Sequence, residues 1–360
     1  MEILLYVLMC IVGFIGVAKE LNTTRSNSGF YYTFLILFLI IACIRLDSKM
    51  ELGDINYYID YFEDDVTSYF EPGYIYFTKA IKFIFGFNPY ILIASASVWI
   101  FVFCNLASKI CSNYIPKDLD YLLSNQKTSF YISLTYFVCV YWGCYFAWQT
   151  LRIGLATSIM LCSSAFFINN KIKHSVVLAL FSILFHTSCV IFAAGIFILS
   201  VLKPLKCNAF LCWIIIIIIT RIVTVDLSAV INVVGTLGDV ETLERFAAYS
   251  DPERFNELGF FGAQNIFYHV SAFLMLKGDL KDPRFNKAVL LYYFGLTLGV
   301  LFQYSEITMR IQSLFLTMIV FVLYYFSIDK HFKLKTKLLI IFAYTIVEMG
   351  FAIRQFGWYI

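Results

Sequence analysis

Long apolar runs recur from one end of this 360-residue chain to the other. Hydrophobic residues make up 61% of the sequence and charged residues only 14%, more apolar surface than a water-soluble core of this size would bury. A bilayer core of about 30 Å takes roughly 20 apolar residues per helix, so the runs leave room for about 11 or 12 crossings. They lack the alternation of barrel strands, and backbone groups in lipid must pair internally. The sequence therefore predicts an all-α polytopic membrane helix bundle, one membrane domain over residues 1–360.

The charges on the connecting segments predict which side of the membrane each segment faces. Residues 175–202 form either one long crossing or two short helices that meet at His186. With two short helices, one face collects 17 lysines and arginines against 6 acids, and the positive-inside rule makes that face cytoplasmic. A single crossing would place Lys203, Lys206 and the later basic stretch outside, so we favour the broken pair. Twelve residues of helix rise only about 18 Å, which places His186 within the outer half of the membrane.

Two outer loops are long enough to form a site: residues 46–87, ending in an interfacial or re-entrant helix, and residues 224–262. The first loop mixes carboxylates with aromatic side chains. Aromatic faces stack on sugars, carboxylates accept hydrogen bonds from sugar hydroxyls, and one carboxylate can act as a general base. The alternative is a solvated acidic loop that only helps to fix orientation. The candidate sugar-binding residues are Asp47, Tyr57, Tyr58, Tyr74 and, beside Arg152, Gln149.

The outer face is also rich in arginine, which binds phosphate bidentately where lysine acts as a point charge. Seven of the nine arginines are expected outside, against three of the eighteen lysines. Arg152 follows Gln149 and Thr150 at a helix start, where it binds an anion or extends to lipid phosphate. Arg310 binds phosphate or pairs with Glu306 four residues earlier.

Several classes of protein are excluded by what the sequence lacks. There is no P-loop, GxGxxG, HExxH or GxSxG pattern, so we expect no cofactor and assign no metal. The ten cysteines form no CxxC pair and mostly lie within apolar runs, as buried small hydrophobic residues do. The basic clusters are cytoplasmic, and none indicates nucleic acid.

Three local patterns, together with the helix plan, resemble a known family. They are Arg45 to Tyr58 with Glu71-Pro72-Gly73-Tyr74, then Arg152-Ile153-Gly154-Leu155-Ala156, and then Lys171-Ile172-Lys173 followed by Phe185-His186-Thr187-Ser188. In this plan the chain is similar to the Wzy-type polysaccharide repeat-unit polymerases, specifically the EpsG-like ones. In that family a longer Arg-Xaa-Gly-Xaa-Asp element is frequent, and this sequence leaves open whether Asp47 or Asp54 corresponds to its aspartate.

The resemblance implies a GT-C-like membrane glycosyltransferase in the bacterial inner membrane, with its active site facing the periplasm. A growing glycan on polyprenyl diphosphate would be the donor, and a single lipid-linked repeat unit the acceptor. Its partners would be these lipid-linked oligosaccharides, membrane lipids and a chain-length regulator. On this hypothesis Arg152 and Arg310 bind the diphosphate, with Arg45 or Arg245 assisting. His186, Asp54 or Glu71 would be the catalytic base; the alternative for His186 is a satisfied core histidine.

Other activities also fit outer-face arginines and a broken helix. A transporter or flippase of lipid-linked oligosaccharide is the main alternative, although the sequence shows no inverted repeat. An O-antigen ligase would need a lipid A core acceptor. A histidine-dependent acyltransferase would be expected to open toward the cytoplasm, where only His174 and His331 are available.

Overall fold

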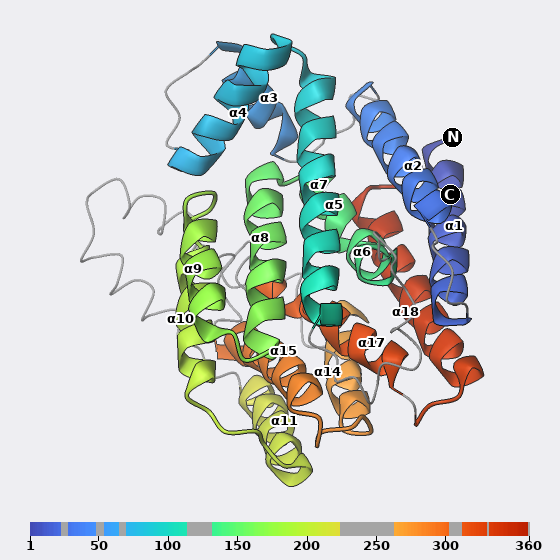
Figure 1. Ribbon diagram of the computed structural model, residues 1–360, viewed down its shortest axis with the longest axis vertical. Helices are drawn as coiled ribbons and strands as arrows, with labels where there is room; N and C mark the ends of the chain where they lie inside the picture. Colours follow the sequence, from blue (N-terminus) through green and yellow to red (C-terminus); the bar gives the residue numbers. More distant parts are fainter. Residues whose placement is uncertain are drawn as a thin grey trace. The chain divides into compact units, whose positions relative to one another are not determined.

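The computed structural model is entirely helical over the residues it describes, which are 1–22, 28–47, 54–64, 70–113, 132–223, 263–301, 312–329 and 331–358 (Figure 1). Five helices in these ranges are both long and apolar enough to cross a membrane. Their bounds are Glu2–Asn22, Ser28–Leu46, Pro89–Ser112, Leu151–Ile168 and Leu334–Gln355. Shorter apolar helices lie between them. The chain is a multi-pass membrane protein, as the apolar runs predict.

The chain divides into two compact units. The first unit comprises residues 1–190 and 323–360, and the second comprises residues 191–322. Two helices contain the boundaries between them: α10 (Cys189–Ser200) and α17 (Ile319–Ile328).

The first unit is built around one central helix, α8. Every residue of α8 except Arg152 and Phe166 is buried, and its main neighbours in this unit are α5 and α9. Helices α1 and α2 pack side by side, and the chain termini meet where the Trp358 indole N–H donates to Glu2 Oε2 at 2.8 Å (Figure 1). The helices of this unit are α1 (Glu2–Asn22), α2 (Ser28–Asp47), α3 (Ile55–Asp64), α4 (Pro72–Phe85), α5 (Pro89–Asn113), α6 (Ile132–Cys139), α7 (Trp142–Trp148), α8 (Leu151–Ile168), α9 (Ile172–Ile183) and α18 (Leu334–Gln355).

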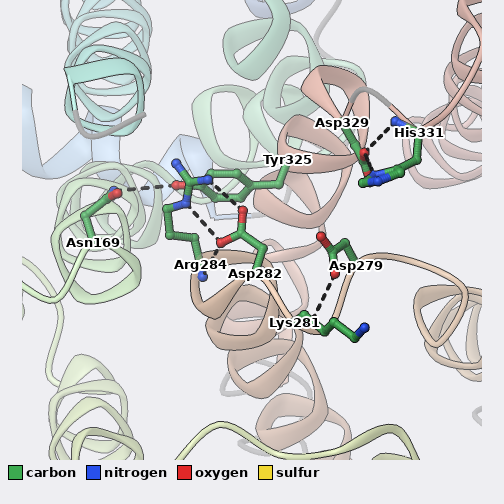
Figure 2. Close-up of polar contacts among 8 residues, drawn as sticks. All are labelled: Asn169, Asp279, Lys281, Asp282, Arg284, Tyr325, Asp329 and His331. Carbon is green, nitrogen blue, oxygen red and sulfur yellow. Dashed lines mark hydrogen bonds and ion pairs between the residues drawn. The ribbon is translucent and has the colours of Figure 1, made fainter. Parts of the chain in front are cut away.

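In the second unit, α11 (Cys207–Ile222), α14 (Ala263–Met275) and α15 (Pro283–Leu301) pack against one another. Asn286 fixes the start of α15 to the segment before α11, since its amide donates to the Leu205 carbonyl at 2.7 Å and accepts from the Leu205 N–H at 3.1 Å. Figure 2 shows the local pairs near this start, with Arg284 against Asp282 and Lys281 beside Asp279.

One break between helices was predicted from the sequence, and another was not. The predicted break near His186 is confirmed, since α9 ends at Ile183 and α10 begins at Cys189. The apolar run over residues 129–149 is divided into two helices, α6 and α7, which are separated at Val140 and Tyr141. The predicted first outer loop contains an unforeseen helix, α3, besides the expected helix α4. The predicted second outer loop, residues 224–262, lies entirely outside the described residues.

Candidate functional site

The start of α4 is fixed against the end of α9 by Glu71-Pro72-Gly73. Proline is suited to the first turn of a helix, where its missing N–H needs no partner. The Gly73 N–H donates to the Leu184 carbonyl at 2.7 Å, and a Cβ on residue 73 would lie only 2.6 Å from that oxygen. Glycine is therefore required for this close approach, which holds Glu71 over the break between α9 and α10.

A second tight contact places Arg152 at the start of α8. Helix α7 ends at Trp148, and α8 begins three residues later at Leu151. A Cβ on Gly154 would lie 2.8 Å from the Phe146 carbonyl oxygen, so glycine lets the first turn of α8 pack directly on α7. The side chain of Arg152 is 19% exposed, whereas the residues on either side of it are buried. Its side chain therefore stays partly exposed at the helix start.

Glu71 joins these two elements through an ion pair. Arg152 Nη1 lies 2.7 Å from Glu71 Oε2, and Glu71 Oε1 accepts hydrogen bonds from the Thr187 N–H at 3.0 Å and the Thr187 hydroxyl at 3.3 Å. Burial raises the pKa of the Glu71 carboxyl, but the charges of Arg152 and His186 and the Thr187 N–H outweigh it, so the pKa lies below its ordinary value. One carboxylate therefore ties α4, α8 and the α9–α10 break together.

Aromatic rings surround the Arg152 guanidinium. Its Cζ lies 4.4 Å from the Phe70 ring centroid and 5.6 Å from that of Tyr58, within cation–π range. Tyr61 packs edge-on to Phe70 at 4.5 Å, and Tyr74 lies 5.1 Å from the same ring. The Tyr74 hydroxyl is buried and makes no hydrogen bond within the described residues. The arginine thus has a carboxylate on one side and π-faces on the other.

His186 lies in the break itself and is 8% exposed. Its Nδ1 accepts a hydrogen bond from the Ser188 N–H at 3.2 Å, so a neutral ring carries its proton on Nε2. When protonated, the ring also acts electrostatically on the Glu71 carboxyl. Arg152, Glu71 and His186 therefore share one environment.

The sequence profile of the EpsG family matches residues 30–357, nearly the whole chain. The chain belongs to the EpsG family. Membership suggests a membrane protein of the polysaccharide-polymerase type. No curated protein and no solved structure matches the chain.

Two other predicted site residues of this EpsG-family chain lie near the termini, away from Glu71. Arg45 is 2% exposed, pairs with Glu2 at 3.4 Å and stacks on Phe356 at 4.5 Å. Gln149 exchanges hydrogen bonds with Gln355, including Gln355 Nε2 to Gln149 Oε1 at 3.0 Å. Both contacts tie the end of α18 to the rest of the first unit.

The remaining predicted residues of the EpsG-family chain fall into two groups. Asp54 and Tyr57 are exposed at the start of α3, and Tyr57 also contacts Phe70 at 5.3 Å between ring centroids. The side chain of Asp47 lies outside the described part of the structure, and so do Arg245 and Arg310.

Some residues of the site had no clear sequence signal. Phe70 and Tyr61 were visible only as two of several aromatic residues in the loop, and Thr187 binds Glu71 partly through its backbone N–H, which every residue except proline has. Among the described residues, no group of three or more histidine, cysteine or acidic side chains could hold a metal ion.

At the opposite end of α8, Asn169 makes a neutral contact, and Asp329 and His331 form a local pair in the segment before α18. Asn169 reaches the Tyr325 hydroxyl at 3.5 Å, and Asp329 accepts from His331 Nδ1 at 2.8 Å (Figure 2). His331 is 78% exposed, so its pairing is of the weak surface kind. The tightly enclosed ion pair of α8 is therefore at the Arg152 end.

Proposed function

We propose that this EpsG-family protein polymerises lipid-linked oligosaccharide repeat units at the outer leaflet. The donor is a growing glycan on polyprenyl diphosphate, and the acceptor is a single lipid-linked unit. The observation that carries the proposal is Arg152, a guanidinium held by Glu71 and aromatic rings at the helix ends that the lysine distribution places outside.

The reaction needs charge stabilisation more than any other protein contribution. A hydroxyl at the non-reducing end of the acceptor attacks the anomeric carbon of the donor, a carbon–oxygen bond forms, and the bond to the diphosphate breaks. Negative charge then develops on the departing lipid diphosphate. A preorganised guanidinium directed at that oxygen stabilises the charge, and removing one such donor typically costs about 100- to 1,000-fold in rate. Arg152 is suited to this role because its position is fixed before substrate arrives.

The hydrogen bonds of Glu71 and His186, compared with the exposed side chain of Asp54, indicate the acid–base role to which each residue is suited. Both Glu71 oxygens already accept hydrogen bonds and the pKa of its carboxyl is lowered, which favours a positioning role toward Arg152. His186 Nδ1 is engaged by Ser188, so the neutral ring is suited to donate a hydrogen bond from Nε2. Asp54 has an exposed carboxylate that accepts no hydrogen bond within the described residues. We assign Asp54 as the base that takes the acceptor hydroxyl proton.

The aromatic residues near Arg152 provide a surface for sugar. Tyr57 is 54% exposed and contacts Phe70, whose ring faces the guanidinium. A sugar ring stacked on Tyr57 would therefore lie next to the group that binds its diphosphate. Glycan and diphosphate are recognised together in this arrangement, as a lipid-linked donor requires.

Glycan length distinguishes this proposal from flipping. Full-length protein in membrane vesicles is supplied with lipid-linked repeat units, and the products are resolved by size. Wild type is expected to give a ladder of lengthened glycans, Arg152→Gln to lose it by at least about 100-fold, and Asp54→Asn to lose it as well. The control is Arg354→Gln, which alters an exposed arginine in the last turn of α18. Relocated but unlengthened units with wild type, or an intact ladder with Arg152→Gln at normal protein level, would overturn the proposal.

A further inference from the structure

Arg221 lies on the buried face of α11 in the second unit. The fully or nearly fully buried residues of this helix follow one another at helical spacing: Phe210, Ile214, Ile217 and Arg221. The opposite face is exposed and apolar, with Ile215, Ile216, Ile219 and Ile222. The outward face is therefore the one suited to lipid, and Arg221 points into the packed interior of the unit. An arginine extending to lipid headgroups would lie on the other face.

The guanidinium of Arg221 is enclosed, and the described part of the chain places no compensating charge beside it. Its side chain is 6% exposed, and Nε and Nη1 are buried with no hydrogen-bond acceptor among the residues that the structure describes. Within the same residues no carboxylate pairs with it. Arg284 of the same unit, on the face predicted to be cytoplasmic, is instead held by Asp282 at 2.6 Å (Figure 2). A buried charge without a partner is costly, so an anion that binds there would remove a large penalty.

His269 adds a second group beside Arg221. It lies on α14, which packs against α11, and the Arg221 charge acts on its ring. His269 Nδ1 lies 2.6 Å from the Asn265 carbonyl, which can only accept, so Nδ1 carries a proton and the ring is held in place. A bound anion with more than one negative charge would favour protonation of Nε2 as well, which would give the site a second cationic donor.

We infer that Arg221 and His269 bind the diphosphate of a lipid-linked isoprenoid substrate. This rests on the proposed polymerase function, in which two lipid diphosphates take part, a donor and an acceptor. One feature favours a diphosphate over the single phosphodiester of a phospholipid. The bidentate geometry of guanidinium suits either group, but an arginine with a histidine on the neighbouring helix suits an anion that carries several negative charges. Among the described residues Arg221 thus has no carboxylate partner, whereas Arg152 is paired with Glu71.

The test is equilibrium binding of radiolabelled farnesyl diphosphate to the full-length protein in phosphatidylcholine nanodiscs. Arg221→Gln is expected to weaken one class of binding sites by at least about tenfold, and Arg221→Lys by less, because lysine keeps the charge and loses the bidentate geometry. Arg354→Gln is the matched control, since Arg354 also lies in the last turn of its helix and is exposed. Melting temperature is recorded for each variant, and Arg221→Lys carries the test if Arg221→Gln does not fold.

Each outcome decides the inference. Unchanged binding by the Arg221 variants would overturn it, whether or not wild type lengthens glycans. Loss of the Arg221-dependent binding when phosphatidylglycerol replaces phosphatidylcholine would also overturn it, because the site would then be an ordinary phospholipid headgroup site. If wild type binds through Arg221 but produces no glycan ladder, the polymerase proposal fails and the diphosphate site stands.

Discussion

Two arginines at helix ends, Arg152 on α8 and Arg221 on α11, are embedded in opposite ways. Arg152 is locked by Glu71 at 2.7 Å and by the rings of Phe70 and Tyr58. Arg221 is more deeply buried and has no carboxylate partner among the described residues. The difference separates two properties that a phosphate site needs. A paired arginine has a fixed position but little net charge, whereas an uncompensated arginine has net charge to offer.

Removal of Arg152 is the largest expected effect and tests the pairing directly. Arg152→Gln would leave Glu71 enclosed without its cation and is expected to lower the free energy of unfolding by about 3 kcal/mol, the lower end for a buried pair because Arg152 is partly exposed. The double variant with Glu71→Gln should recover part of that loss, since no charge is then left uncompensated. Thermal melting of wild type, the two single variants and the double variant in detergent measures the coupling energy. Strictly additive losses would show that the pair is not energetically coupled.

Acidic pH should break the ion pair between Glu71 and Arg152, because it protonates the Glu71 carboxylate. The folded-state pKa of Glu71 lies below its ordinary value, so its stabilising contribution is complete above the ordinary carboxyl pKa and is lost as the pH falls through the lowered value. Between neutral and acidic pH, the melting temperature of wild type should therefore fall further than that of Glu71→Gln. Parallel curves for the two proteins would mean that the carboxylate does not contribute in the folded state.

Gly73→Ala is expected to have the next largest effect, because it breaks the docking that positions Glu71. The added Cβ would lie 2.6 Å from the Leu184 carbonyl oxygen, which is backbone and cannot rotate away. We expect a loss of about 1–3 kcal/mol in unfolding free energy together with reduced glycan lengthening.

Gly350→Ala in α18 is its matched control. It meets open space and should raise stability by up to about 1 kcal/mol, since alanine is the better helix former. Equal behaviour of the two alanine variants in melting experiments would show that Gly73 is not tightly packed.

The sequence predicted the helical architecture well because lipid makes the apolar runs easy to recognise. It also predicted the break between α9 and α10, since lysine placement required two short helices there. The break between α6 and α7 was not foreseen, because neither Val140 nor Tyr141 is a glycine, a proline or a charged residue. Interruptions were predictable only where topology required them.

The candidate site was predictable as residues but not as contacts. Glu71, Arg152 and His186 were selected by residue type and position, yet the pairing of Glu71 with Arg152 spans 81 positions of sequence. Nothing in the local pattern indicates which acid of the first loop meets which arginine. Arg45 shows the same limit, because its partners Glu2 and Phe356 come from opposite ends of the chain.

Phe70→Leu tests the aromatic contact with Arg152, and its effect on stability and on glycan lengthening should be smaller. Leucine keeps an apolar contact but removes the π-face that lies 4.4 Å from the guanidinium, which is worth about 0.5–2 kcal/mol. Phe70→Tyr, which keeps the face, is the conservative comparison. Glycan ladders and melting temperature should fall for leucine and stay near wild type for tyrosine, whereas equal losses would assign Phe70 to packing alone.

The smallest stability effect is expected at Arg221, and it sharpens the comparison most. Arg221→Gln removes a buried charge that has no carboxylate partner in the described part of the chain, so it leaves no opposite charge stranded. In the absence of ligand the melting temperature should stay the same or rise, the reverse of Arg152→Gln. A fall as large as that of Arg152→Gln would mean that a protein group compensates Arg221, and the two arginines would then differ in location but not in kind.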